Sequence, residues 1–359
     1  MDASGRALAR PHDVRKGPMT PKERMCKVLA FERADRVPFA PAVYEHKAFL
    51  IGRTPSEVAR APELLVRAVE REYGLYGPDL ITVGLDVYNV EAEALGAQVR
   101  FYDGPEVPGI PEPPYTPSEA LKLEVPDPRE AGRMPLFLEA AKGVQDELGG
   151  EVMVRGGVSG PFSLASELVG LERLLVGTLD DIEGIGRLLA FCTEVCLAYA
   201  DAFRKVAGCG VVIFDSRAAP PLLSPELFRD LLLPHYRRLF GELKARGHRH
   251  LPLIIGGDTT SVLPYILESG ATQVLCDWPA DTGAFARSCA EARVPWRKNL
   301  DSGLVHRGPT EELVRQARGI LEECGGMPGF ILGTGVVAYD TPPEHILALR
   351  DVVCKFRRS

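Results

Sequence analysis

Short apolar runs alternate along the chain with longer stretches in which apolar residues recur at helical spacing. Most of the short runs are continuously apolar, which is typical of strands covered on both faces. We predict strands at residues 36–40, 79–85, 152–156, 210–215, 251–255, 272–277, 294–299 and 329–332. Helices are expected near residues 54–73, 135–149, 162–206, 225–246, 260–269, 281–292, 310–324 and 342–356.

This alternation predicts an α/β fold, a (β/α)8 TIM barrel, with an open doubly wound sheet as the alternative. Thr20, Ser224 and Thr341 each precede a proline and are expected to cap helices. Residues 104–130 are rich in proline and acidic residues and lack a period, so we expect a long loop insertion after strand two. Residues 1–18 are predicted to be a flexible leader and residues 19–359 a single barrel domain with an N-terminal extension.

Composition and charge exclude several classes of protein. With 45% hydrophobic residues over 359 positions, the chain can bury a large core and is not expected to be disordered. A net charge of −7 argues against nucleic-acid binding, and no apolar run is long enough for a membrane helix. The 8 cysteines are scattered without a CxxC motif and no signal peptide is visible, so we expect a cytoplasmic protein.

In a barrel of this kind, catalytic residues lie where strands end and the following loops begin. Candidates for proton transfer or charge stabilisation at these positions are Glu45, His46, Asp86, Asp215 and Ser216. Substrate-binding candidates are Phe162, Glu167, Arg217, Gly256, Gly257, Asp258, Asp277, Trp278, Asn299 and Asp301. No histidine is evidently paired with the serine, which disfavours a Ser-His-Asp nucleophile.

Simpler structural roles remain open for these residues. Asp86 and Asp215 are equally typical of helix caps, and the Gly256–Asp258 turn either binds an anion or closes a tight loop. Glu45, His46 and Asp86 together are a weak candidate for a metal site. Trp278 is either part of an aromatic wall for a planar ligand or a packing residue.

The chain resembles the uroporphyrinogen decarboxylase superfamily, which also contains corrinoid-dependent methyltransferases. The resemblance rests on segments in a common order, at residues 82–86, 93–96, 160–165, 214–216, 223–228, 299–301 and 340–344. It extends from about residue 19 to residue 353 and implies a (β/α)8 barrel. A homodimer is compatible with it.

The resemblance is stronger to the methyltransferase branch over residues 86–96, 160–170 and 223–228. That branch uses a His-x-Cys zinc motif after strand five and a further cysteine after strand eight. Here these positions fall on Ile254, Gly256 and either Gly335 or Val336, so zinc at the family site is not expected. The arginine-rich segment of the decarboxylases corresponds to residues 37–46, which contain no arginine.

Carboxylates outnumber cations at the predicted mouth, which favours a neutral or cationic ligand over a polyanion. The acidic residues are Glu45, Asp86, Asp215, Asp258, Asp277 and Asp301, and the basic ones are Lys47, Arg217, Arg297 and Lys298. The favoured function is methyl transfer between a small molecule and a corrinoid on a partner protein. The alternatives are a tetrapyrrole decarboxylase that uses Asp86 and Ser216, and a noncatalytic corrinoid- or tetrapyrrole-binding protein.

Overall fold

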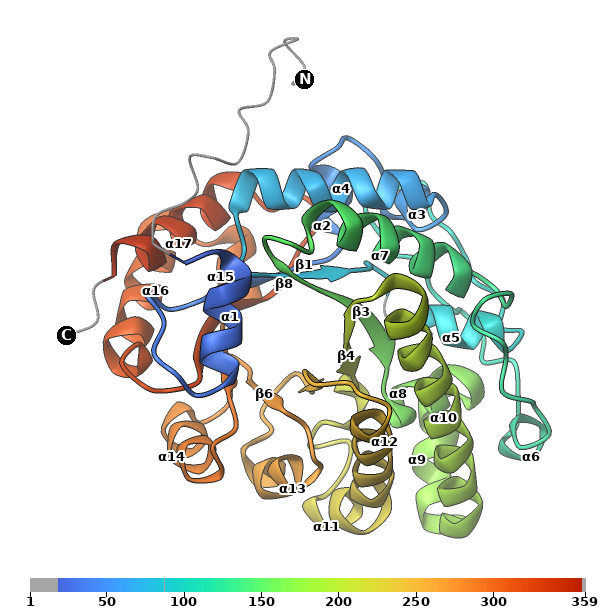
Figure 1. The fold of residues 1–359 in the computed structure, drawn as a ribbon. Coiled ribbons are helices and arrows are strands. Elements are labelled where there is room, and N and C mark those ends of the chain that lie inside the picture. The colour runs from blue at the N-terminus through green and yellow to red at the C-terminus, as the bar shows by residue number, and fades with distance from the viewer. Residues whose placement is uncertain (1–18, 87, 357–359) are drawn as a thin grey trace.

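The computed structural model describes residues 19–86 and 88–356, and in this part of the chain 8 parallel strands form a barrel (Figure 1). The strands are β1 (Phe39–Val43), β2 (Leu80–Val83), β3 (Met153–Ser159), β4 (Gly210–Phe214), β5 (Pro252–Ile254), β6 (Gln273–Cys276), β7 (Trp296–Leu300) and β8 (Phe330–Val337). Their hydrogen-bonded order is β1-β8-β7-β6-β5-β4-β3-β2. The predicted barrel is therefore confirmed, whereas the predicted leader at 1–18 lies outside the described residues.

Helices surround the strands (Figure 1). Those before β4 are α1 (Pro21–Leu29), α2 (His46–Phe49), α3 (Pro55–Val58), α4 (Pro62–Tyr76), α5 (Asn89–Ala94), α6 (Pro117–Ala120), α7 (Met134–Leu148), α8 (Pro161–Val169), α9 (Leu171–Asp180), α10 (Ile182–Ala202) and the π-helical turn η2 (Phe203–Ala207). Those after β4 are η3 (Ser216–Ala218), α11 (Pro225–Leu227), η4 (Phe228–Leu232), α12 (Leu233–Ala245), η5 (Thr260–Val262), α13 (Leu263–Glu268), α14 (Thr282–Ala292), α15 (Ser302–Arg307), α16 (Thr310–Cys324) and α17 (Pro343–Lys355).

The first and last strands differ most from the predicted boundaries. The first strand lies three residues later than expected, because Pro41, which cannot donate a ladder hydrogen bond, is accommodated at a register shift between β1 and β8. The last strand continues to Val337 through Gly333 and Gly335, which the sequence pattern placed in a loop. Both glycines lie at positions where an added Cβ would collide with neighbouring atoms.

Helix boundaries depend on caps and glycines. The predicted helix over 162–206 is three helices, because Gly170 adopts a φ of 88° and Asp181 caps a new start. Thr20 forms the expected cap, and Ser224 accepts a hydrogen bond from the N–H of Leu227. The prediction for Thr341 was wrong, because α17 begins at Pro343 without a side-chain cap.

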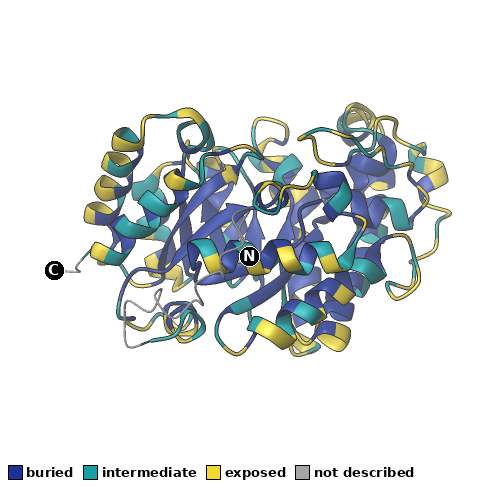
Figure 2. Cartoon of the chain, turned by 90° about the horizontal axis from the view of Figure 1, so that it is seen from above, coloured by how far each residue is buried: buried dark blue, intermediate teal, exposed yellow. Residues whose placement is uncertain are grey.

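Burial follows the barrel plan: strands and inward helix faces are buried, and the outer helix faces are exposed (Figure 2). Side chains of neighbouring strands also pack on each other, as the Trp296 ring on β7 does edge-on against the Phe330 ring on β8. Within the described ranges, no helix is long and apolar enough to cross a membrane.

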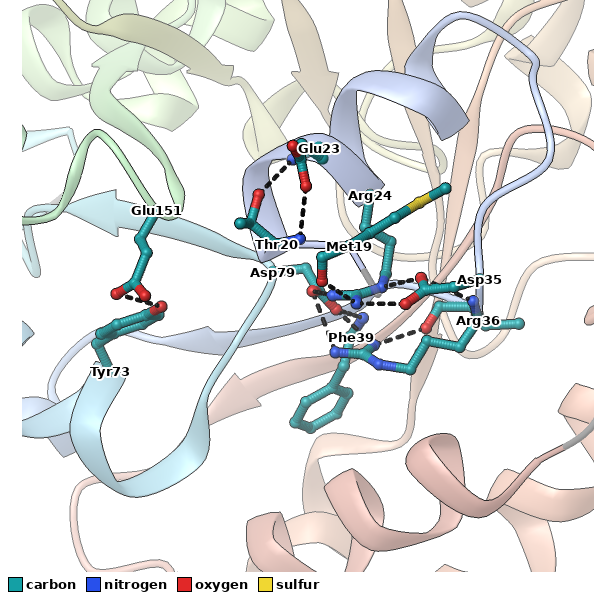
Figure 3. A network of polar contacts seen from close by, with 11 residues as sticks. Met19, Thr20, Glu23, Arg24, Asp35, Arg36, Phe39, Tyr73, Asp79 and Glu151 are labelled. Atoms are coloured by element: carbon teal, nitrogen blue, oxygen red, sulfur yellow. Dashed lines mark hydrogen bonds and ion pairs between the residues drawn. The ribbon is translucent and has the colours of Figure 1, made fainter. Parts of the chain in front are cut away.

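An ion-pair network, the lower network, closes the barrel at the N-terminal ends of β1 and β2 (Figure 3). It comprises Arg24, Asp35, Arg36 and Asp79. The fully buried Asp79 carboxylate accepts hydrogen bonds from both guanidinium groups, with Arg36 Nη1 at 2.7 Å. It also accepts the N–H of Phe39 at 2.7 Å, while the carbonyl of Phe39 accepts the N–H of Asp79 at 2.8 Å. Charge compensation at this end is complete, since Arg24 also binds Asp35 at 2.6 Å.

Candidate active site at the C-terminal end of the barrel

A cavity of about 470 Å³, the mouth cavity, lies at the C-terminal ends of the strands. Its apolar lining consists of Ala42, Leu85, Val107, Phe214, Ile254, Leu275, Trp278 and Val336. Its polar side chains are Tyr44, Glu45, Tyr88, Ser216, Asp277, Arg297, Asn299 and Ser302. The volume is suited to a small molecule, and an apolar wall with a few convergent polar groups is typical of an active site.

Six of the sequence-predicted residues meet at this cavity. They are Glu45, Ser216, Gly256, Asp277, Trp278 and Asn299, contributed by the ends of β1, β4, β5, β6 and β7. The strand-end rule therefore brought together residues that are up to 254 positions apart, from Glu45 to Asn299.

Glu45 lies at the start of α2, where its carboxyl group faces the cavity without a hydrogen bond to the helix end. Burial raises the pKa of this carboxyl group, and the nearby Lys47 offsets that effect only in part. A carboxyl group with a raised pKa keeps its proton closer to neutral pH, so Glu45 is suited to act as a general acid.

Two polar arrangements fix the opposite wall of the cavity. Asp277 accepts hydrogen bonds from Asn299 Nδ2 at 2.9 Å and from the N–H of Gly257 at 2.8 Å. Ser216 Oγ accepts the N–H of Gly256 at 3.1 Å. These bonds hold the loops after β5 and β6 against each other and leave the polar groups pre-organised around the cavity.

Tyr44, Tyr88 and Arg297 also line the cavity and were not among the predicted site residues. Tyr88 has a backbone φ of 81°, and its hydroxyl accepts the N–H of Ser216 at 3.3 Å. A bulky residue in this conformation is strained, and such strain is concentrated at functional sites. Arg297, one of the basic residues of the predicted mouth, could have been given a binding role, because a charged residue in a strand predicted to be buried rarely occurs without a partner or a function.

Asp86 lies beside a second, much smaller cavity with Tyr88 and Glu91, not on the mouth cavity. Its carboxylate forms an ion pair with Arg133 at 2.6 Å and accepts a hydrogen bond from Asn89. Burial raises the pKa of Asp86, and the charge of Arg133 counteracts this shift. Its predicted catalytic role stays a prediction, and the geometry assigns it to holding the loop after β2.

Asp215 and Phe162 form a buried helix cap instead of a ligand site. The Asp215 carboxylate accepts the N–H groups of Phe162 at 3.2 Å and Ser163 at 2.6 Å, and the hydroxyl of Tyr236 at 2.8 Å. These contacts satisfy N–H groups at the N-terminus of α8, whereas the side chain forms no cap on η3, the turn that directly follows Asp215.

His46 points away from the mouth cavity. Its Nδ1 lies 2.8 Å from the carbonyl oxygen of Tyr339 and its Nε2 lies 2.7 Å from the hydroxyl of Tyr76. Burial lowers its pKa. Because both ring nitrogens are engaged, the predicted roles as a proton donor or as a metal ligand with Glu45 and Asp86 are not supported.

Other predicted carboxylates are also occupied elsewhere. Glu167 forms an ion pair with Arg217, Asp258 accepts hydrogen bonds from Thr260, and Asp301 caps α15 through the N–H of Leu304 at 2.9 Å. Glu45 and Asp277 are therefore the carboxylates of the predicted mouth that line the cavity. The expectation of a strongly acidic mouth was wrong, because sequence position does not distinguish a helix cap from a free carboxylate.

Comparison with known proteins decides the family. The sequence model of the family described as Uroporphyrinogen decarboxylase (URO-D) matches residues 20–356. The chain belongs to the uroporphyrinogen decarboxylase family. The resemblance inferred from the sequence segments is thus confirmed.

Within the uroporphyrinogen decarboxylase family, both branches are represented among the relatives. The chain is 25% identical to the methylcobamide:CoM methyltransferase MtaA of Methanosarcina barkeri, covering 92% of this chain and 96% of the relative. It is 30% identical to a uroporphyrinogen decarboxylase of Sorangium cellulosum, covering 84% and 86%. A solved methyltransferase from Methanosarcina mazei superposes with a TM-score of 0.82 at 25% identity, covering 93% of this chain and 98% of that chain.

The zinc positions implied by the methyltransferase branch lie on the cavity wall of this family member. Ile254, Gly256, Gly335 and Val336 all line the mouth cavity, and none carries a side chain that binds zinc. Among the described residues, no group of three or more histidine, cysteine or acidic side chains is arranged to hold a metal ion. The residues present do not fit the branch's zinc site.

Proposed function

We propose that this chain transfers a methyl group between a small molecule in the mouth cavity and a corrinoid carried by a partner protein. The observation that carries the proposal is the apolar rim above the polar pocket. Val107, Trp278 and Val336 line the cavity with exposed fractions of 40%, 51% and 47%. Exposed apolar groups at an opening are typical of a surface that another molecule covers, and a planar ring system fits such a rim.

The relatives support this reading. The chain matches the methyltransferases from Methanosarcina over almost their whole length, and one of them is a methylcobamide:CoM methyltransferase. When bound, the corrinoid supplies the centre that accepts or donates the methyl group. Because the zinc positions hold Ile254 and Gly256, the small molecule is proposed to be activated by proton transfer instead of by a zinc-bound thiolate.

Glu45 is the proposed proton donor. When protonated, its carboxyl group, whose pKa burial raises, can pass the proton to the heteroatom of the small molecule as the bond from that atom to the methyl group breaks. Asn299, held by Asp277, and Ser216, held by the Gly256 N–H, would orient the same molecule. Side chains fixed in this way keep the reacting atoms aligned.

The charges of the cavity favour this function over decarboxylation of a tetrapyrrole. Among the described residues that line the cavity, Arg297 is the one cationic side chain. A tetrapyrrole substrate with many carboxylates requires several cations around it.

Anaerobic incubation with reduced cobalamin and a panel of methyl ethers, amines and thioethers tests the proposal. Methylation of cobalamin, followed by visible absorbance, is the expected result. Carbon dioxide release from uroporphyrinogen without methyl transfer would refute the proposal. Quenching of Trp278 fluorescence by cobalamin with no turnover on any donor would support the noncatalytic alternative instead.

Glu45→Gln tests the role of the acid. We expect the rate of methyl transfer to fall by about 10²-fold or more, as is typical when a general acid is lost. In the unaltered enzyme the rate should fall as pH rises through the raised pKa of Glu45, because only the protonated form donates, and this limb should be missing in the variant. Glu63→Gln, an exposed site on α4, is the matched control and should keep the rate and its pH profile.

A further inference from the structure

Two buried arginines lie near each other inside the barrel, and one of them, Arg297, lines the mouth cavity. Arg297 on β7 is 2% exposed and lines the cavity, and Arg155 on β3 is 1% exposed. Arg155 Nε donates to Thr82 Oγ1 at 2.9 Å. Arg155 Nη1 and Arg297 Nε are buried, and within the described part of the chain neither has a hydrogen-bond partner.

No carboxylate among the described residues forms an ion pair with either guanidinium group. The charge of Asp277 offsets that of Arg297 in part, but the two side chains form no ion pair, and the Asp277 oxygens accept hydrogen bonds from Asn299 and from the N–H of Gly257. The other titratable neighbours are Tyr44, which faces both arginines, and His250, which faces Arg155 and whose pKa burial lowers to about 3. Neither supplies a negative charge at neutral pH.

The two positive charges also oppose each other. Burial, together with the charge of Arg297, lowers the pKa of Arg155 to about 9. Burial likewise lowers the pKa of Arg297. A buried charge without a counter-ion is costly, so an anion at this point would relieve both groups.

The backbone of β8 makes room for this arrangement. An added Cβ at Gly333 would lie 2.7 Å from Arg297 Cδ and 2.8 Å from the carbonyl oxygen of Ala40. Gly333 therefore allows the Arg297 side chain to cross the strand and reach the cavity. The position of the Arg297 side chain therefore depends on the absence of a side chain at residue 333 of β8.

We propose that Arg297, with the positive charge of Arg155 behind it, forms the binding site for an oxyanion group of the small-molecule substrate, a carboxylate, sulfonate or phosphate. A planar guanidinium fork matches such a group and can donate paired hydrogen bonds to it. The inference rests on the proposed function in taking the mouth cavity as the substrate site. It replaces the expectation of a neutral or cationic ligand with that of an acidic one.

Binding of simple oxyanions tests the inference without any corrinoid. Thermal melting of the full chain in low-salt buffer is followed against acetate, methanesulfonate and inorganic phosphate, with acetamide and dimethyl sulfone as neutral probes. We expect a saturable rise in Tm with at least one oxyanion and none with the neutral probes, and the strongest oxyanion identifies the chemical class. The absence of a saturable response to all three oxyanions would overturn the inference.

Variants separate a binding role from a structural one. Arg297→Gln and Arg155→Gln should each weaken oxyanion binding by at least 10-fold, a loss typical of one charge-assisted hydrogen bond. Without ligand, Arg297→Gln should melt at or above the temperature of the unaltered protein, because it removes an uncompensated buried charge. Unchanged oxyanion affinity in both variants, or a ligand-free Arg297→Gln that melts lower or does not fold, would contradict the site.

The exposed Arg237→Gln, whose partner is Glu268, is the matched control for loss of a positive charge and should bind oxyanions unchanged. The outcome is independent of the methyl-transfer assay. Oxyanion binding with no methyl transfer would refute the proposed function and keep the site. Methyl transfer by a protein that does not bind oxyanions would support the proposed function and refute the oxyanion site.

Discussion

Of the buried arginines that the structure describes, those at the N-terminal end of the barrel form ion pairs and two in its interior do not. At the N-terminal end, Arg24 and Arg36 share the buried Asp79, and Arg24 also binds Asp35 (Figure 3). Farther along the barrel interior, Arg155 and Arg297, the upper pair, form no ion pair with a carboxylate among the described residues. The lower network closes the seam between β1 and β2, whereas Arg297 of the upper pair lines the mouth cavity.

The difference indicates which charges serve stability and which serve binding. In barrels of this class the N-terminal end is associated with stability and the C-terminal end with catalysis. A compensated charge holds elements together, and removing its partner is costly. An uncompensated charge beside a cavity reduces stability until a ligand arrives, which is a common feature of functional sites.

Asp79→Asn should have the largest effect on stability. The substitution leaves Arg24 and Arg36 buried without their shared negative charge, and breaking a buried pair of this kind typically costs about 3–5 kcal/mol. Urea unfolding at neutral pH measures the loss. Asp127→Asn, which removes the partner of the exposed Arg129, is the control and should leave unfolding unchanged. Equal losses of unfolding free energy in Asp79→Asn and Asp127→Asn would show that the lower network stabilises the fold no more than an exposed ion pair does.

Gly333→Ala should have an intermediate effect. The new methyl group meets Arg297 Cδ and the backbone of Ala40, and overpacking of this kind costs about 1–3 kcal/mol. Oxyanion affinity should fall in parallel, because Arg297 is displaced. Gly319→Ala on α16, where a Cβ meets nothing within 4 Å, is the matched control and should not destabilise the protein.

A double-mutant cycle sharpens the argument about Gly333. Combined with Arg297→Ala, Gly333→Ala should cost less free energy of unfolding than it does alone, since the collision with Arg297 Cδ is gone and those with the Ala40 carbonyl oxygen and Asn299 Oδ1 remain. Strictly additive changes in the free energy of unfolding would mean that the cost of Gly333→Ala does not depend on the Arg297 side chain.

The pH dependence of the lower network should be the smallest of these effects. Burial by itself would raise the pKa of Asp35, but its hydrogen bond and charge interaction with Arg24 lower the pKa overall. A lowered pKa stabilises the fold above the ordinary value of 3.8, and this contribution is lost as pH falls through the folded-state pKa. Urea unfolding between about pH 5 and pH 2 should therefore show a weaker acid dependence in Asp35→Asn. An identical acid dependence would contradict the role of this pair.

The barrel could be predicted from the sequence because eight buried parallel strands leave a strong and repeated apolar pattern. The pattern failed where local rules conflict with tertiary structure. Pro41 is normally a sign that a strand has ended, and Gly333 and Gly335 normally indicate a turn, yet all three lie within strands. The pairing of β1 with β8 overrides both signals.

The site could be predicted only in part, because strand ends locate a region but not the direction of each side chain. Asp215 and Asp301 stand at strand ends and cap helices, whereas Glu45 stands at a strand end and faces the cavity. Arg155 was missed because it lies inside a predicted strand, where an apolar pattern is expected. Only the three-dimensional structure shows that its Nη1 lacks a partner.

A crystal structure of the protein with the best-binding oxyanion would test the central claim most directly. We predict the oxyanion in the mouth cavity, with its oxygens within hydrogen-bond distance of the Arg297 guanidinium group. The claim would be contradicted if both guanidinium groups were instead bound to carboxylates of the chain and the oxyanion lay elsewhere.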